Sequence, residues 1–119
     1  MRIEHLEPGE IFVFGSNAAG HHGAGAAKDA YERFGAVWGQ GRGLHGSSYG
    51  IDTMSGIETI ETEVAAFLAF AGRHPELLFL VTEVGCGIAG YQPEQIAPLF
   101  AGAPVNVRLP ERFRAVLAG

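Results

Sequence analysis

The chain has 119 residues, of which 47% are hydrophobic and 18% are charged. Its 18 glycines give about twice the usual share of roughly 7%. This composition excludes a disordered chain and fits one domain over residues 1–119. Eight Lys and Arg against 13 Asp and Glu give a net charge of −5, which disfavours a broad surface for nucleic acid or for an anionic membrane.

A single cysteine, Cys86, limits the chemistry that the chain can support. One thiol excludes an intramolecular disulfide and a zinc site of the Cys₂His₂ or Cys₄ type. We therefore expect a reducing compartment, the cytoplasm. We also expect neither a metal nor a cofactor. No apolar run approaches the roughly 18 to 20 residues of a membrane span, so we expect no membrane partner.

The first half of the chain alternates between strand and helix patterns. Residues 11–14 are continuously apolar between turn-forming residues, which is typical of a strand buried on both faces of a parallel sheet. Apolar residues at helical spacing predict a helix over residues 26–34. Residues 35–48 are rich in glycine and predict a long loop, and residues 48–54 predict a second strand. Apolar positions three and four apart then predict a helix over residues 57–71.

The second half of the chain continues the alternation. Residues 77–82 predict another buried strand, and residues 83–91 predict a second glycine-rich loop. A proline at the start of residues 93–100 suits the first turn of a helix. Residues 105–109 predict a short last strand, and Pro110 opens a terminal helical turn. The resulting order, βαβαβαβα, predicts a three-layer α/β/α domain with a mainly parallel sheet.

Two glycine-rich loops occupy equivalent places, because each follows a buried strand and precedes a helix. In an open α/β sheet, ligands bind where such loops converge at the carboxyl ends of the strands. Backbone N–H groups exposed by glycine, together with a helix N-terminus, bind phosphate without a charged side chain, which suits an acidic chain. The alternative is that the glycines serve only close packing of helix and sheet. The candidate ligand-binding residues are Gly15, Ser16, Asn17, Gly23, Ala24, Gly25 and Ala26 in the first loop and Gly85, Cys86, Gly87, Ile88, Ala89, Gly90 and Tyr91 in the second.

Three polar side chains of the first loop each have two interpretations. The amide of Asn17 suits a hydrogen bond to a ribose hydroxyl, and it equally suits an Asx-turn that only shapes the loop. His21 and His22 are candidates for metal binding or acid–base chemistry, but adjacent loop residues seldom face one site. We therefore favour surface positions for both histidines.

Cys86 and two aromatic residues also have two interpretations each. Exposed N–H groups near Cys86 would lower its pKa and make it a nucleophile, but a cysteine between two glycines is more often a small packing residue, which we favour. Trp38 and Tyr91 are candidates to stack on a base, and packing or a plain surface position explains them equally well.

The residues of the two loops also carry a family resemblance. Residues 23–27 read Gly-Ala-Gly-Ala-Ala, and residues 85–90 read Gly-Cys-Gly-Ile-Ala-Gly. In their strand–loop–helix context they resemble the loops of the macro domain family, whose members bind ADP-ribose and in many cases hydrolyse ADP-ribosyl bonds. The branch that removes ADP-ribose from DNA bases or glutamate side chains has a similar Gly-x-Gly-Ile-Ala loop and a similar Gly-Cys-Gly-Leu loop. The resemblance covers residues 10–109, and residues 48–51 and 91–94 also resemble small macro-like proteins of phages and bacteria.

This resemblance implies a macro-like fold and a site for ADP-ribose or a related nucleotide diphosphate. It implies that Asn17 approaches the distal ribose, that residues 23–27 contact the distal ribose and the diphosphate, and that residues 85–91 wrap the diphosphate. It also admits an ADP-ribosylated macromolecule as the partner.

Two departures from the family pattern bear on the activity. The hydrolase branch has a lysine where this chain has Met54, and some members use an acidic residue where this chain has Ala89. A leading strand with the aspartate that reads adenine in larger macro domains is not evident. The missing lysine and acidic residue favour a binding module, whereas the missing leading strand bears on the recognition of adenine. The alternatives are an ADP-ribosyl hydrolase acting on modified DNA or protein, with Asn17 as its catalytic residue, and a non-enzymatic interaction domain with structural glycines.

Overall fold

Residues 3–119, which the computed structural model describes, fold around a five-stranded mixed sheet. The strands are β1 (Glu10–Ser16), β2 (Gly43–His45), β3 (Ser48–Asp52), β4 (Leu78–Val81) and β5 (Val107–Arg108). Their order is β2-β3-β1-β4-β5, with β2 antiparallel to β3 and all other pairs parallel. The expected α/β class with a mixed, mainly parallel sheet is confirmed. The first two residues of the predicted domain lie outside the described residues.

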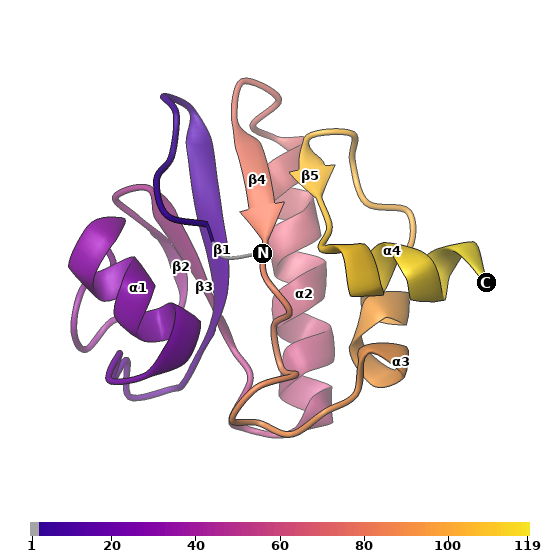
Figure 1. Cartoon of the computed structure of the whole chain (residues 1–119), viewed down its shortest axis with the longest axis horizontal. Coiled ribbons are helices and arrows are strands. Elements are labelled where there is room, and N and C mark those ends of the chain that lie inside the picture. The colour runs from indigo at the N-terminus through magenta and orange to yellow at the C-terminus, as the bar shows by residue number, and fades with distance from the viewer. Residues whose placement is uncertain (1–2) are drawn as a thin grey trace.

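Four α-helices and one 3₁₀ turn connect or follow these strands in the described part of the chain. The helices are α1 (Gly25–Arg33), α2 (Ile57–Gly72), α3 (Pro93–Ile96) and α4 (Glu111–Ala118), and the 3₁₀ turn η1 (Ala97–Phe100) follows α3 directly. Figure 1 shows α2 behind β4, whereas α1 lies beside β1 and β2 on the left of the view.

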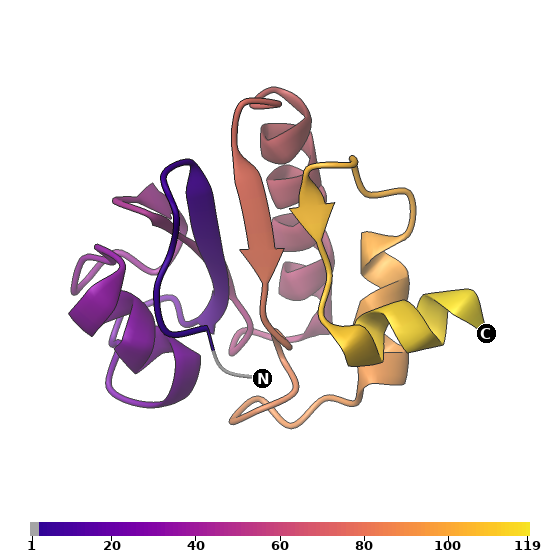
Figure 2. The same ribbon diagram turned by 45° about the horizontal axis from the view of Figure 1, so that its top comes forward.

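Helices cover β1 from both faces. Ile11 and Val13 belong to a buried cluster that includes apolar side chains of α2, α3 and α4, while Phe12 and Phe14 belong to a separate cluster with α1. Successive side chains of a strand point to opposite faces, so α1 lies on one face of β1 and the other helices on the opposite face. The two views agree with this division (Figures 1 and 2). The prediction that residues 11–14 form a strand buried on both faces is confirmed.

The longest helix, α2, forms because its apolar residues recur at steps of three and four. Ile60, Val64, Phe67 and Ala71 are fully buried against the sheet. The Phe67 ring is the centre of this packing, because it meets the Phe79 ring at a centroid distance of 5.4 Å and an interplanar angle of 82°. Edge-to-face contacts of this kind add to the free energy that burial of the ring contributes.

Several predicted elements differ from the structure. The loop expected over residues 35–48 is wrong in part, because Gly43–His45 forms the edge strand β2, which also interrupts the predicted βαβαβαβα alternation. The strands expected over residues 48–54 and 105–109 are shorter, at Ser48–Asp52 and Val107–Arg108. The helix expected over residues 93–100 changes from α to 3₁₀ geometry, because Pro98 has no N–H for an α-helical hydrogen bond.

No helix in the described part of the chain combines the length and apolar character that crossing a bilayer requires.

Two loops on the α1 side are held together by direct contact between their backbones. The amide of Gly39 donates to the carbonyl of Gly20 at 2.9 Å. A side chain at Gly41 would collide with the carbonyl oxygen of Asn17, and one at Gly20 would collide with the backbone of Gln40. These glycines therefore serve close packing, and they fix the segment around residue 40 against the loop that follows β1.

Replacing Gly41 tests this contact. We expect Gly41→Ala to lower the free energy of unfolding by about 2 to 3 kcal/mol, because the new methyl group forces two backbone segments apart. The control is Gly72→Ala at the exposed end of α2. We expect this substitution to raise the free energy of unfolding by about 0.5 to 1 kcal/mol, since alanine favours the helix. Urea denaturation followed by circular dichroism measures both. A Gly41→Ala protein as stable as the parent would contradict the contact.

Candidate functional site

A cavity of about 530 Å³ lies at the carboxyl ends of three parallel strands. The end of β1, the turn after β3 and the loop after β4 all contribute to its wall. In Figure 1 the β4 arrow points to the lower edge of the view, and the loop that follows β4 runs along this edge to α3. The lining comprises residues 15–17, His21, residues 23–27, Thr53, Met54 and residues 82–89.

The position of the cavity follows from the sheet topology. The chain leaves β1 for α1 on one face of the sheet and leaves neighbouring β4 for α3 on the opposite face. Where two adjacent parallel strands send their loops to opposite faces, a crevice opens between the loops, and open α/β proteins bind ligands there. The prediction that both glycine-rich loops meet at one place is confirmed.

Most of the residues predicted for the site line this cavity, and two do not. Gly90 and Tyr91 instead close the second loop, because Gly90 donates its N–H to the carbonyl of Gly87 at 3.0 Å and Tyr91 donates to that of Gly85 at 2.9 Å. Tyr91 also packs against the larger core cluster. These two residues therefore set the shape of the loop from outside the cavity.

The cavity also includes residues outside the predicted ligand-binding set. Sequence reasoning had considered His21 and Met54 and, through the family resemblance, Ala27; the residues that it missed are Thr53, Thr82, Glu83 and Val84. Thr53 directly follows β3, and Thr82 directly follows β4. The sequence could have predicted that both threonines lie at the site, because each directly follows a parallel strand and parallel strands end at the same edge of a sheet.

In the part of the chain that the structure describes, the backbone of both loops has N–H groups that no hydrogen bond uses. Helix α1 has no side-chain cap, and its first intrahelical bond runs from the Lys28 N–H to the Ala24 carbonyl at 3.2 Å. The N–H groups of residues 25–27 therefore have no partner within the helix. Among the hydrogen bonds of the described residues, none uses the N–H groups of residues 87–89 either. Residues 25–27 and 87–89 all line the same cavity.

Two glycines of the lining are required neither by backbone conformation nor by packing. Gly23 and Gly87 lack positive φ angles, and a side chain added at either would meet no protein atom within 4 Å. Gly20 and Gly41 are different, because there a side chain would collide with backbone. The packing interpretation therefore fits Gly20 and Gly41, and Gly23 and Gly87 leave open space at the cavity.

Asn17 shapes the loop that follows β1. Its Oδ1 accepts the N–H of His21 at 2.9 Å, and its Nδ2 donates to the carbonyl of His21 at 3.0 Å. These bonds reach four residues along the chain, not the two of an Asx-turn, so the expected turn type is wrong, but Asn17 does shape the loop. Asn17 also lines the cavity, so its role toward a ribose stays a prediction.

The expected surface position of His22 is wrong. His22 is only 1% exposed, and its Nε2 lies 3.0 Å from the Val37 carbonyl and 3.1 Å from the Gln40 carbonyl. Two carbonyl oxygens can only accept, so Nε2 carries the hydrogen. A polar residue in a glycine-rich loop gave no sign of burial, because its partners are backbone carbonyls some 15 and 18 positions away. His21 is exposed as expected.

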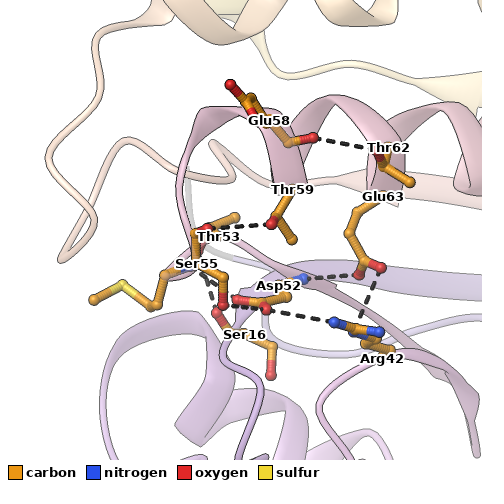
Figure 3. Close-up of polar contacts among 10 residues, drawn as sticks. Ser16, Arg42, Asp52, Thr53, Ser55, Glu58, Thr59, Thr62 and Glu63 are labelled. Carbon is orange, nitrogen blue, oxygen red and sulfur yellow. Dashed lines mark hydrogen bonds and ion pairs between the residues drawn. The ribbon is translucent and has the colours of Figure 1, made fainter.

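The turn after β3 is fixed by a buried carboxylate. Asp52 is fully buried, and it accepts the Met54 N–H at 3.0 Å and the Ser55 hydroxyl at 2.6 Å. Arg42 lies 3.8 Å from this carboxylate and 3.4 Å from that of Glu63, which accepts the Asp52 N–H at 3.1 Å (Figure 3). Because a buried carboxylate needs such partners, this network holds Met54 at the cavity wall.

Ser16 contributes a buried hydroxyl that has no partner among the described residues. The Thr53 hydroxyl donates to the Ser16 carbonyl at 3.3 Å, as Figure 3 shows, but the Ser16 hydroxyl itself is left without a hydrogen bond. A buried polar atom of this kind is unfavourable unless a ligand or water completes it. Ser16 is one of the residues that line the cavity, and its hydroxyl oxygen lies buried behind the cavity surface.

The titratable side chains of the lining include Cys86 and Glu83, which lie close enough to influence each other. Burial and the nearby Glu83 carboxylate raise the pKa of the Cys86 thiol above its ordinary value, which disfavours the thiolate that a nucleophile needs. Glu83 is paired with Arg112 of α4, whose Nη1 lies 3.0 Å from its Oε1. Among the described residues, no three His, Cys, Asp or Glu side chains gather as metal ligands would.

The pH dependence of Cys86 alkylation tests this environment. Because the pKa is raised, we expect the iodoacetamide rate to reach half its maximum at a pH above that of an ordinary thiol. Glu83→Gln should move this midpoint to lower pH, since it removes a carboxylate and leaves the Arg112 charge uncompensated. Mass spectrometry follows both titrations. A midpoint below that of free cysteine would contradict the account and restore the nucleophile interpretation.

The comparisons with known proteins give no relative from which a function could be transferred. No family model, curated protein or solved structure matches the chain. The resemblance of the two loops to the macro domain family therefore stays a prediction, and the argument for function rests on the cavity itself.

Proposed function

We propose that the cavity binds ADP-ribose or a related nucleotide diphosphate, in a three-layer macro-like domain, and that main-chain N–H groups of the two loops hold the diphosphate. The observation that carries this proposal is the convergence of two sets of unused N–H groups, from residues 25–27 and residues 87–89, on one cavity. Backbone N–H groups in such loops bind phosphate oxygens, and a helix N-terminus adds a partial positive charge.

The charge distribution supports recognition through the backbone. No lysine or arginine is among the residues that line the cavity in the described part of the chain. The only carboxylate in the lining, that of Glu83, is compensated by Arg112 at 3.0 Å. The N-terminus of α1 carries no acidic residue in its first turn, so an anion meets no opposing charge there.

The size and the open places of the cavity also suit a nucleotide. About 530 Å³ lies within the range of roughly 300 to 1,000 Å³ that small-molecule sites occupy. Gly23 and Gly87 leave open space beside the backbone of the two loops. The proposed ligand would occupy space that no described side chain fills.

The proposal is for binding without turnover. Met54 lies in the cavity wall, at the place where the macro domain branch resembled here has a lysine, and Ala89 replaces an acidic residue. The remaining titratable groups of the wall are His21, Glu83 and Cys86, and the last has a raised pKa. A binding module of this kind recognises ADP-ribose free or attached to a macromolecule. A single cysteine supports a cytoplasmic location for it.

Thermal unfolding with nucleotides tests the proposed function. We expect ADP-ribose at about 100 times its dissociation constant to add about 2.7 kcal/mol to the free energy of unfolding. The midpoint should rise on the order of 10 °C for a domain of this size. ADP, NAD and ribose 5-phosphate at the same concentration should raise it less. No rise with any of the four at millimolar concentration would contradict the proposal and leave a glycine-rich interaction domain.

Gly87→Ala separates a ligand contact from a structural role. The added methyl group meets no protein atom within 4 Å, so we expect stability to be kept or raised by about 0.4 to 1 kcal/mol. The same methyl group enters the space next to residues 87–89, so ADP-ribose affinity by calorimetry should fall about tenfold or more. Gly72→Ala, outside the cavity, is the matched control and should bind as the parent does. Unchanged affinity of Gly87→Ala would show that the diphosphate lies elsewhere.

A further inference from the structure

An exposed aromatic surface adjoins the cavity. It consists of the rings of His21, Trp38 and Tyr31, called here the aromatic platform. The His21 and Trp38 rings are stacked, with a centroid distance of 5.4 Å and an interplanar angle of 15°. The Tyr31 ring meets Trp38 edge-on at 5.5 Å. Trp38 is 50% exposed and Tyr31 is 46% exposed, although large aromatic side chains are usually placed where most of their surface is buried.

The loop that carries Trp38 is held in place by buried contacts beneath it. The Nε2–H of buried His22 is shared between the carbonyls of Val37 and Gln40, which flank Trp38 on either side. The His22 ring also meets the Phe14 ring of the core at 5.5 Å, close to perpendicular. Buried contacts of His22 therefore hold the segment that carries Trp38, whose ring stays half exposed.

The aromatic platform is continuous with the cavity through His21. His21 lines the cavity, and both amide atoms of Asn17 hydrogen-bond its backbone. His21 therefore belongs both to the lining of the cavity and, through its ring, to the aromatic platform. A ligand that fills the cavity and extends past His21 meets the platform next.

We propose that the aromatic platform stacks a nucleobase carried by the ligand of the cavity. This inference rests on the proposed function and deepens it, because it names the group that the second part of the site recognises. Any nucleobase can stack on an exposed aromatic ring, because every base has a flat π-face. The net charge of −5 disfavours recognition of a phosphate chain, whereas a base is neutral and tolerates an acidic protein.

The nucleobase has two sources that fit this geometry. It is the base of the bound nucleotide itself, or it is the base of a nucleic acid strand to which the ADP-ribosyl group is attached. The chemistry of recognition is the same in both cases. Binding of ADP-ribose alone, compared with binding of an ADP-ribosylated single-stranded oligonucleotide, separates the two sources.

Trp38 gives this proposal a direct readout, because it is the only tryptophan of the chain. We expect ADP-ribose, or the ADP-ribosylated oligonucleotide, to quench and shift Trp38 fluorescence as the cavity fills. Ribose 5-phosphate and pyrophosphate, which have no base, should leave the fluorescence unchanged. Quenching by ADP-ribose assigns the base of the nucleotide, and quenching by the modified oligonucleotide alone assigns the base of the strand.

Substitution of Trp38 tests the energetic role of the stack. We expect Trp38→Leu to lower the affinity for the quenching ligand, measured by calorimetry, by about tenfold. A base–aromatic stack contributes about that much to binding. Trp38→Phe keeps a ring and should retain most of the affinity. Leu44→Ala, which changes an exposed apolar residue of β2 outside the cavity lining, is the control and should bind as the parent does.

The outcomes distinguish this proposal from the proposed function. ADP-ribose could raise the unfolding midpoint while neither ligand changes Trp38 fluorescence and both bind Trp38→Leu as tightly as the parent. In that case the stacking proposal is wrong and the cavity proposal stands. If Trp38→Phe binds as weakly as Trp38→Leu, stacking is also overturned. If neither ligand binds by calorimetry, both proposals fail together.

Discussion

The parallel pairing of β1 with both β3 and β4 is the constraint on which the rest of the structure depends. Strands that run in one direction end at one edge, so the segments after all three strands must meet there. The chain leaves β1 on one face of the sheet and leaves β3 and β4 on the opposite face, so a crevice opens between these loops. The site is therefore made of loop backbone, and its lining is mostly glycine, alanine and small polar residues.

The glycines divide according to what surrounds them, and this division connects packing to binding. At Gly20 and Gly41 the backbone of another segment occupies the place of a side chain, which fixes the loop of Trp38 against the loop of Asn17. At Gly87 the same place is empty and faces the cavity. Glycine thus has two roles: it lets two loops pack closely, and it leaves the backbone at the cavity uncovered. Uncovered N–H groups can bind an anion without a cationic side chain.

The sequence predicted the elements whose apolar residues form a regular pattern. The strand over residues 11–14 and the helix over residues 57–71 were found because burial on two faces, or on one helical face, leaves a distinct pattern. Gly43–His45 has no such pattern, since β2 is a short edge strand with little buried surface. The meeting of the two loops followed from topology. The burial of His22 did not, because it depends on carbonyl partners that only the folded chain brings together.

The most direct test of the central claim observes the backbone N–H groups themselves. In ¹⁵N-labelled protein titrated with ADP-ribose, the account predicts that the largest amide shifts fall on residues 25–27 and 87–89. The amide of Gly72, at the far end of α2, should not move. Shifts confined to the hollow near residues 102–109, or an absence of shifts at millimolar ligand, would contradict a diphosphate held by these two loops.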